Sequence, residues 1–343
     1  MIRIDVAQFG DIGQSIYRPL DELSISPEGL SPRLIKNGYD SYSMLNGRVY
    51  ALPLDPSVQI FLYRTDLFHD AKLCRAYYER FHENLVVPTT YEQYLHAAEF
   101  FTRSCNPASP TEYGTTMTCG SASVAASDFL PFYLSRIDRF GSTPETLRLD
   151  CPEMQAAMRQ YHALEKFSCK QNWWGDSIQK FAEGKTAMTV IYSNYAAELI
   201  NSGNSVVVGR VGAAILPGCK PLLGGGIVGI SRYSQKAEAC KQFFHWYYSA
   251  DVASLLVRLG GTSPIVDAYE DFQNYSIFPW MNTSKKSFGL GQRGVINQTP
   301  ERFSIPKYEF AVGTAVRNVV QDLMTPEDAS RMAQALYDAA EPV

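Results

Sequence analysis

The sequence predicts an α/β protein that is divided into two lobes. Its 343 residues exceed the roughly 100–200 residues that one domain usually holds, so two lobes are the expectation. Strand-like apolar runs alternate with segments of helical periodicity along the whole chain, which is typical of the α/β class. With 45% hydrophobic and 19% charged residues, the composition is that of a globular protein with a well-buried interior.

The first predicted elements are strands. Residues 2–9 alternate apolar and polar side chains, as a half-buried strand does. Asn46-Gly47 is a strong hairpin-turn signal, and residues 49–54 after it are strand-like. Residues 60–63 form a further β-rich run. Later strands are predicted at residues 186–191, 206–216 and 227–230.

Helices are predicted where apolar residues recur at helical spacing beside a suitable cap. Thr89 or Thr90 is such a cap for a helix that ends near Phe101, and Thr325 precedes Pro326 at the start of the last helix. The other predicted helices cover residues 126–137, 152–167, 177–183, 236–249 and 310–323, and the last covers 326–339.

A run of three glycines, Gly224-Gly225-Gly226, comes directly before the strand predicted at residues 227–230. Phosphate-binding glycine motifs follow a strand and open a helix, so this run is not one of them. A turn is the favoured interpretation, and a close approach of the backbone to a ligand is the alternative.

Neither a nucleic acid nor a membrane is indicated as a partner. The net charge is −4 and lysines and arginines do not cluster, unlike a surface that binds nucleic acid. No apolar run reaches the roughly 18 residues of a membrane span, and the first residues show no secretory signal. The seven cysteines are widely spaced without a C-x-x-C pair. We expect them to be free thiols, which favours a reducing compartment.

The sequence points to no catalytic residue, metal or cofactor. Motifs of the G-x-S-x-G, H-E-x-x-H and Walker types are absent, and the five histidines are interpreted as surface or packed residues. A pair of carboxylates of the glycosidase kind stays open as an alternative, because acidic residues are numerous. The chain is therefore predicted to bind its ligand without converting it.

Short motifs follow one another in a fixed order along the chain. They are residues 46–53 (NGRVYALP), 62–68 (LYRTDLF), 88–94 (PTTYEQY), 181–188 (FAEGKTAM), 217–218 (PG), 225–226 (GG) and 236–252. Together they resemble the family 1 extracellular solute-binding proteins of bacterial ABC importers, the group that includes maltose-binding protein. Residues 181–188 are the most specific of these motifs, and the resemblance covers nearly the whole chain.

The resemblance implies a type II periplasmic-binding-protein fold, with two α/β lobes, a hinge and a ligand cleft between the lobes. Lobe one would contain residues 1–56 and 222–272, and lobe two residues 58–221 and 273–343. In the family, a strand, a helix and a second strand precede the strand that residues 4–6 resemble. That unit is not present here, so lobe one is expected to be incomplete at its N-terminus.

The resemblance also implies which aromatic residues line the cleft. Tyr195 best matches the ring that stacks on a sugar in the family, and Tyr192 is the second choice, with simple packing as the alternative. Trp173 and Trp174 would flank the cleft, or else lie in the core. Tyr308, together with Phe310, matches a further aromatic position, again with core packing as the alternative.

Three more residues are implied at the cleft by the same resemblance. Asp55 and Ser57 match the crossing between the lobes, where Asp55 either accepts hydrogen bonds from sugar hydroxyls or caps a turn before Pro56. Gly225, with its neighbours, would offer backbone N–H groups on the opposite wall.

Three functions are weighed. The leading hypothesis is the binding of a mono- or oligosaccharide for delivery to the membrane permease of an ABC transporter, which by resemblance implies an extracytoplasmic location. The alternative is a sugar-sensing module of a cytoplasmic transcriptional regulator, a location that the missing secretory signal would allow. An enzyme such as a glycosidase is the third.

Overall fold

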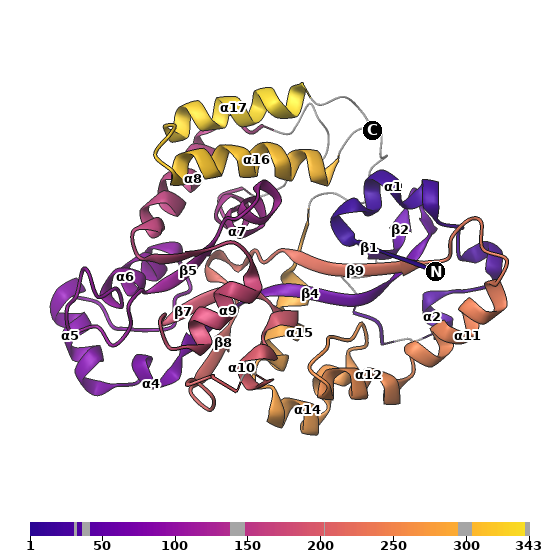
Figure 1. Cartoon of the computed structure of the whole chain (residues 1–343), viewed down its shortest axis with the longest axis horizontal. Coiled ribbons are helices and arrows are strands. Elements are labelled where there is room, and N and C mark those ends of the chain that lie inside the picture. The colour runs from indigo at the N-terminus through magenta and orange to yellow at the C-terminus, as the bar shows by residue number, and fades with distance from the viewer. Residues whose placement is uncertain (31–32, 36–41, 138–147, 202, 294–303, 340–343) are drawn as a thin grey trace.

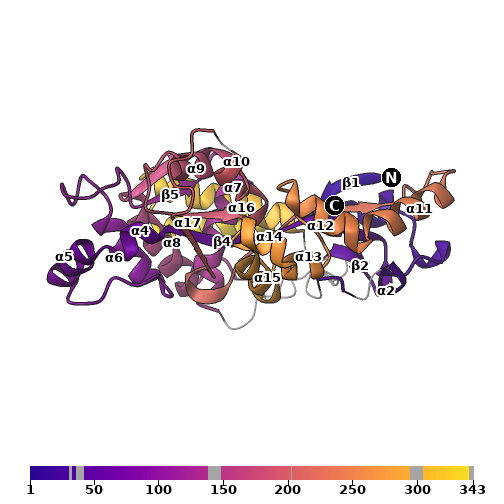
Figure 2. The same ribbon diagram turned by 90° about the horizontal axis from the view of Figure 1, so that it is seen from below.

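One long strand joins the two ends of the molecule. The structure, a computed structural model, describes residues 1–30, 33–35, 42–137, 148–201, 203–293 and 304–339. Both views place helices α5 and α6 at one end and β1 and α11 at the other, with β4 (Ala51–Arg64) between them (Figures 1 and 2). The end that carries the N-terminus is called lobe one below, and the opposite end lobe two.

The elements of lobe one are β1 (Ile2–Asp5), η1 (Val6–Gln8), α1 (Phe9–Ile16), α2 (Pro27–Leu30), β2 (Met44–Leu45), β3 (Arg48–Val49), α11 (Ala237–Tyr247) and α12 (Ala250–Arg258). Those of lobe two are α4 (Thr65–Phe68), α5 (Ala71–Phe81), α6 (Tyr91–Phe100), β5 (Thr115–Thr118), α7 (Ala122–Leu134), α8 (Pro152–Glu165), β6 (Ser168–Gln171), α9 (Trp174–Ala182), β7 (Met188–Tyr192), β8 (Val211–Ala214), α16 (Ile305–Val320) and α17 (Pro326–Asp338).

Strand β4 belongs to both lobes because its partner changes along its length. Its first half pairs with β9 (Leu223–Gly229) up to Val58, and its second half pairs with β7 from Gln59 onward. The resulting order is β1-β9-β4-β7, with β8 also on β4, and every pairing in it is antiparallel. The change from β9 to β7 at residues 58 and 59 lies between the two ends of the molecule, and this part of β4 is called the lobe crossing below.

Sequence explains why β4 is continuous although it contains two prolines, Pro53 and Pro56. Residues Val58–Leu62 are fully buried, which suits a strand covered on both faces. Pro56 lacks an N–H group, and the register of β4 against β9 shifts between Pro53 and Asp55. Such an irregularity accommodates a proline inside a sheet. The two predicted strands at residues 49–54 and 60–63 are thus parts of one.

Helices α7 and α16 are held unusually close together. A Cβ atom on Gly313 of α16 would lie 1.7 Å from the carbonyl oxygen of Ala122, the first residue of α7. Glycine is therefore required for this contact. The packing places the N-terminal ends of both helices beside the lobe crossing (Figure 1).

Most predicted helices are confirmed, with small changes at their ends. Thr90 caps α6 in a reciprocal capping box with Gln93, and Thr325 caps α17. Helix α7 begins four residues before its predicted start. The remaining elements are η2 (Asp21–Leu23), η3 (Ser193–Tyr195), α10 (Glu198–Asn201), η4 (Pro217–Cys219), α13 (Asp267–Glu270), α14 (Phe272–Ile277) and α15 (Met281–Leu290).

Two predicted strands were too long, and one predicted turn is part of a strand. The first strand ends at Asp5, because η1 and α1 follow it directly. Of residues 206–216, only Val211–Ala214 form a strand. The three glycines at 224–226 are not a turn but lie inside β9, paired with residues 55–57 of β4. Among the described residues no helix is long and apolar enough to cross a membrane, and all seven cysteines are free thiols.

Candidate functional site: the cleft at the lobe crossing

A cleft of about 720 Å³ lies at the point where β4 passes from β9 to β7. This volume is within the range of roughly 300–1,000 Å³ that is usual for small-molecule sites. Strands β1, β9 and β4 supply one wall, and the starts of α7, α9 and α16 with the end of β7 supply the other. The lining residues are Arg3, Asp5, Ala7, Gln8, Asp55, Ser57, Ser121, Ala122, Ser123, Val124, Ser127, Trp173, Trp174, Tyr192, Asn194, Tyr195, Gly224, Gly225, Arg293, Pro306, Glu309 and Phe310.

The structure brings seven of the eight predicted site residues to this one cleft. They are Asp55, Ser57, Trp173, Trp174, Tyr192, Tyr195 and Gly225. Tyr308 is the exception, because its side chain points into the core and is only 2% exposed. Its neighbours Glu309 and Phe310 line the cleft instead, and Phe310 is 58% exposed. On this face of α16 the aromatic ring available to a ligand is therefore Phe310.

The aromatic wall of the cleft has an outer and an inner layer. Trp173, which directly precedes α9, is 47% exposed, whereas Trp174 is only 6% exposed. Trp174 packs edge-to-face on Tyr192, with ring centroids 4.9 Å apart. The ring centroid of Trp173 in turn lies 4.9 Å from that of Trp174 and 6.3 Å from that of Tyr195. Trp173 and Tyr195 thus offer ring surface to a ligand, while Trp174 and Tyr192 support them from behind.

The opposite wall is formed by glycines that leave the backbone bare. Gly225 has φ of +91°, and a Cβ atom there would lie 2.1 Å from the carbonyl oxygen of Asp55. Only glycine suits this position. Next to it, the Tyr42 hydroxyl donates to the carbonyl oxygens of Ser57 and Gly224. The bulged region of β4 and β9 is therefore fixed by a buried side chain from lobe one.

An ion pair crosses this wall above Gly226. The Arg3 guanidinium donates to both carboxylate oxygens of Asp55, at 2.7 and 3.2 Å. A Cβ atom on Gly226 would approach the Arg3 Nε to 2.3 Å. The glycine thus lets Arg3 reach from β1 across β9 to β4. Both side chains are nearly half exposed, so the pair contributes little to stability.

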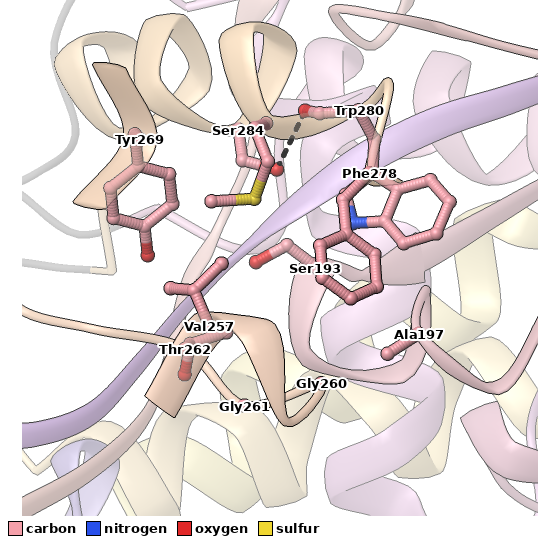
Figure 3. Close-up of a pocket in the computed structure, with 11 residues that line it drawn as sticks. Ser193, Ala197, Val257, Gly260, Gly261, Thr262, Tyr269, Phe278, Trp280 and Ser284 are labelled. Atoms are coloured by element: carbon pink, nitrogen blue, oxygen red, sulfur yellow. Dashed lines mark hydrogen bonds between the residues drawn. The ribbon is translucent and has the colours of Figure 1, made fainter. Parts of the chain in front are cut away.

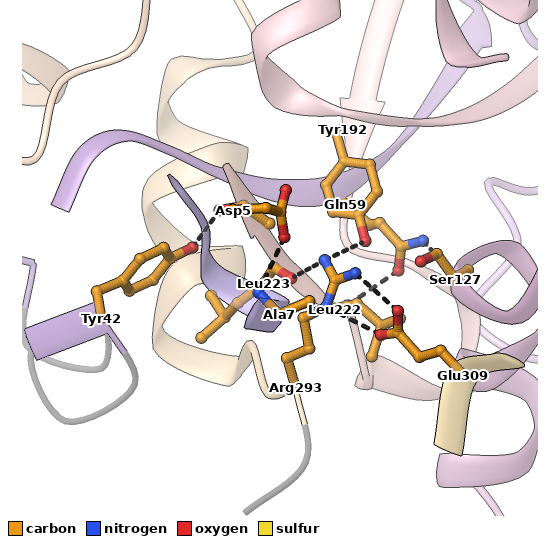
Figure 4. Close-up of polar contacts among 11 residues, drawn as sticks. Asp5, Ala7, Tyr42, Gln59, Ser127, Tyr192, Leu222, Leu223, Arg293 and Glu309 are labelled. Carbon is orange, nitrogen blue, oxygen red and sulfur yellow. Dashed lines mark hydrogen bonds and ion pairs between the residues drawn. The ribbon is translucent and has the colours of Figure 1, made fainter. Parts of the chain in front are cut away.

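A second ion pair lies beneath the cleft and is almost completely buried. Arg293 donates from Nε and Nη2 to the two carboxylate oxygens of Glu309, at 3.0 and 3.1 Å. Its Nη1 donates to the carbonyl oxygen of Leu223 at 3.0 Å and to the Tyr192 hydroxyl at 3.4 Å (Figure 4). Burial raises the pKa of Glu309, and the charge of Arg293 opposes that shift. The guanidinium therefore joins β9, β7 and α16.

Gln59 completes the polar network at the lobe crossing. Its side-chain Nε2 donates to the carbonyl oxygen of Ser127 in α7 at 2.8 Å, and its Oε1 accepts from the Leu222 N–H at 2.9 Å (Figure 4). The side chain is fully buried. A buried amide with both ends paired fixes α7 relative to β4 and β9.

A second cavity, shown in Figure 3, is too small for a ligand. Its volume is about 10 Å³, which is about the minimum for one water molecule. Ser193 and Ala197 face Val257 and Trp280 across it. The Ser284 hydroxyl donates to the Trp280 carbonyl oxygen at 3.1 Å. The cleft is therefore the better candidate for a functional site among the described residues.

Four charged lining residues were not predicted as site residues: Arg3, Asp5, Arg293 and Glu309. The alternation in residues 2–5 was an available signal, since it puts Arg3 and Asp5 on the same face of a strand. Arg293 and Glu309 carry no local motif. They meet only because the chain returns to the lobe crossing after α15.

Comparison with known proteins identifies the family. A family model for bacterial extracellular solute-binding proteins matches residues 5–280. The chain belongs to this family. The match spans both walls of the cleft up to α15 and includes the long strand that joins the lobes.

Solved structures of solute-binding proteins have the same fold. The protein of Agrobacterium radiobacter K84 in complex with ribitol aligns with a TM-score of 0.78 at 22% identity, over 97% of this chain and 82% of that one. The maltose-bound MalE3 of T. maritima aligns with a TM-score of 0.77 at 18% identity, over 98% of this chain and 83% of that one. The protein of Agrobacterium vitis S4 with bound D-mannitol gives 0.74 at 19%, also over 98% and 83%. The predicted two-lobed fold is confirmed.

Membership of the solute-binding family also bears on the alternatives. The family is an extracellular one by description, in agreement with the predicted extracytoplasmic location. The ribitol and D-mannitol proteins are described as ABC transporter components. The alternative of a sugar-sensing regulator finds no support in these similarities.

Proposed function

We propose that the chain binds a carbohydrate or polyol in the cleft and delivers it to the membrane permease of an ABC importer, without converting it. The observation that carries the proposal is the cleft itself. The exposed rings of Trp173 and Phe310 and the half-buried ring of Tyr195 line the same cavity as the polar groups of Asp55 and Ser57. A sugar requires this combination, because its C–H faces stack on rings while its hydroxyls need hydrogen-bond partners.

The ligands of the structural relatives support this substrate class. Ribitol and D-mannitol are linear polyols, and maltose is a disaccharide. A cleft of about 720 Å³ has room for either. The family description supports an extracytoplasmic site of action, on the cell surface or in the periplasm.

The proposed movement is a hinge closure about the lobe crossing. Lobe one would comprise residues 1–56 and lobe two residues 58–221, with the first crossing at Ser57. Helix α14 packs on α12 and α13, and α15 packs on α13, which favours the assignment of both to lobe one. We therefore place the last crossing near Arg293 instead of residue 272. Ligand binding would favour the closed state by its greater affinity for that state.

A thermal-unfolding screen tests the proposed function. The probes are maltose, D-mannitol, ribitol and D-tagatose, with the wild type beside Tyr195→Ala and Tyr233→Ala. A ligand that binds only the folded state stabilises it by about 2.7 kcal/mol at a concentration of about 100 Kd. Tyr233 is exposed and lies outside the cleft lining, so its variant is the matched control.

We expect at least one probe to raise the unfolding temperature of the wild type and of Tyr233→Ala, and to have a weaker effect on Tyr195→Ala. The same probes should be recovered unchanged after incubation with the protein. The proposal fails if no probe shifts unfolding, or if the two tyrosine variants respond alike. Hydrolysis of a probe would favour the enzyme alternative.

A further inference from the structure

The described part of the cleft carries a small excess of negative charge. The charged side chains in its lining are two arginines, Arg3 and Arg293, and three carboxylates, Asp5, Asp55 and Glu309. Two positive and three negative groups leave a net charge of −1. A solute that enters the cleft is separated from bulk water. Inside the cleft such a charge therefore acts on the solute more strongly than it would on an open surface.

Both arginines of this cleft are already committed to carboxylates. Arg3 is bidentate to Asp55 and Arg293 is bidentate to Glu309. An acidic solute could recruit either guanidinium only by breaking a two-bond ion pair. For Arg293 that would leave the charge of Glu309 buried without its partner, which is costly.

Asp5 is the carboxylate that has no such partner. Its Oδ1 accepts one hydrogen bond, from the Ala7 N–H at 2.9 Å, and caps the short helix η1. Among the described residues no cation lies within ion-pair distance of Asp5, although the charges of Arg3 and Arg293 act on it from farther away, and no hydrogen bond to its Oδ2 is found. The side chain is half-buried and lines the cleft. Figure 4 shows it near Arg293 and Leu223.

The starts of α7, α9 and α16 offset this negative charge in part. All three line the cleft, and Ser121 caps α7 by accepting from the Val124 N–H. A helix N-terminus amounts to about half a positive charge, but Asp176 in the first turn of α9 opposes that charge, and Pro306 in the first turn of α16 has no N–H group. These partial charges suit the oxygen of a hydroxyl group as well as an anion, and they do not pair the Oδ2 of Asp5.

We propose that Asp5 gives the cleft a preference for solutes with a positive group, so that an amino sugar or amino polyol binds ahead of its neutral counterpart and an acidic counterpart binds least. The ammonium group would donate to the free Oδ2 of Asp5, while the rings of Trp173 and Tyr195 hold the rest of the solute. This inference rests on the proposed function, because it names the solute class of the same site.

Two matched sets of solutes test the preference by isothermal titration calorimetry. One is cellobiose, the β-1,4-linked glucosamine disaccharide and cellobiouronic acid. The other is D-glucitol, D-glucamine and D-gluconate. The proteins are the wild type, Asp5→Asn and the control Asp251→Asn. Asparagine also caps helices, so Asp5→Asn keeps the bond to Ala7. Asp251 is exposed and outside the cleft lining, and its variant loses the same charge.

In at least one set we expect the amino member to bind the wild type about tenfold more tightly than the neutral member, because a charge-assisted hydrogen bond replaces a neutral one. The preference should weaken between about 20 mM and about 300 mM salt. It should disappear in Asp5→Asn and persist in Asp251→Asn, with both variants folded as judged by thermal unfolding.

The outcomes separate this inference from the proposed function. If sugars of the unfolding screen bind but amino members bind no more tightly than neutral ones, only the charge preference is wrong. The same holds if Asp5→Asn retains the preference, or if the acidic member binds as well as the amino member. If neither the screen nor the matched sets bind, the proposed function fails and the inference fails with it.

Discussion

Arg293 and Glu309 form a bidentate ion pair whose two side chains are only 9% and 3% exposed. The pair lies at the lobe crossing, where Arg293 also reaches the carbonyl oxygen of Leu223. Removing two charges from water is costly, and their attraction offsets that cost only when the geometry is good and the remaining donors are paired. Here both carboxylate oxygens are paired, and three guanidinium nitrogens donate.

Removing one member of this pair should therefore destabilise the protein strongly. In Glu309→Gln the charge of Arg293 stays buried without a carboxylate, and we expect a loss of about 3–5 kcal/mol in the free energy of unfolding. Replacing both residues by methionine should recover most of that loss, since a buried pair contributes little over apolar residues of similar volume. Urea denaturation measures each value.

An exposed ion pair provides the control for this prediction. Asp21→Asn breaks the exposed contact of Asp21 with Arg48, and we expect little change in the free energy of unfolding. The interpretation of the buried pair is wrong if Glu309→Gln costs no more than Asp21→Asn. It is also wrong if the double methionine variant is less stable than the single one.

Local chemistry explains which parts of the fold could be predicted from the sequence. Thr90 and Thr325 stand directly before helices whose first turns they cap. Each capping residue and the backbone N–H group that it binds are only three residues apart in the sequence. The continuity of β4 could not be predicted in this way. Asp55-Pro56-Ser57 has the composition of a turn. These residues form part of a strand only because they pair with Gly225 and its neighbours in β9.

The same distinction applies to the site. The family motif at residues 181–188 was a guide to its neighbours Trp173, Trp174, Tyr192 and Tyr195. The resemblance correctly predicted that these four residues line the cleft. Tyr308 was misplaced because the helical face of α16 was not fixed by any motif. Arg293 and Glu309 become neighbours through tertiary packing alone, which no local pattern encodes.

A buried carboxyl group in α7 should make stability depend on pH. Burial raises the pKa of Asp128 from its ordinary 3.8 to about 7, against the hydrogen bonds it accepts from Tyr161 and Thr118. The unfolded chain releases the proton near pH 4, whereas the folded chain keeps it until about pH 7. The contribution of Asp128 to the free energy of unfolding is therefore fully present below pH 4 and is lost as the pH rises to about 7.

The loss corresponds to about 4 kcal/mol, since each pKa unit is worth about 1.4 kcal/mol. Asp128→Asn cannot ionise and should lack this dependence. The variant should therefore gain stability relative to the wild type as the pH rises from 4.5 to 8, with no further gain above. Urea denaturation across this range is the measurement. A constant difference between the two proteins would show that Asp128 is ionised in the folded state.

The two adjacent tryptophans should differ in what their removal changes. Trp173 is about half exposed at the cleft, whereas Trp174 is packed between Trp173 and Tyr192. Trp173→Ala should lower the affinity for a sugar that passes the screen by about tenfold, with little effect on unfolding. Trp174→Ala should cost about 3–5 kcal/mol of stability, because it leaves a cavity. Calorimetric titration and urea denaturation of both variants check this. Equal stability losses, or unchanged binding by Trp173→Ala, would contradict the layered wall.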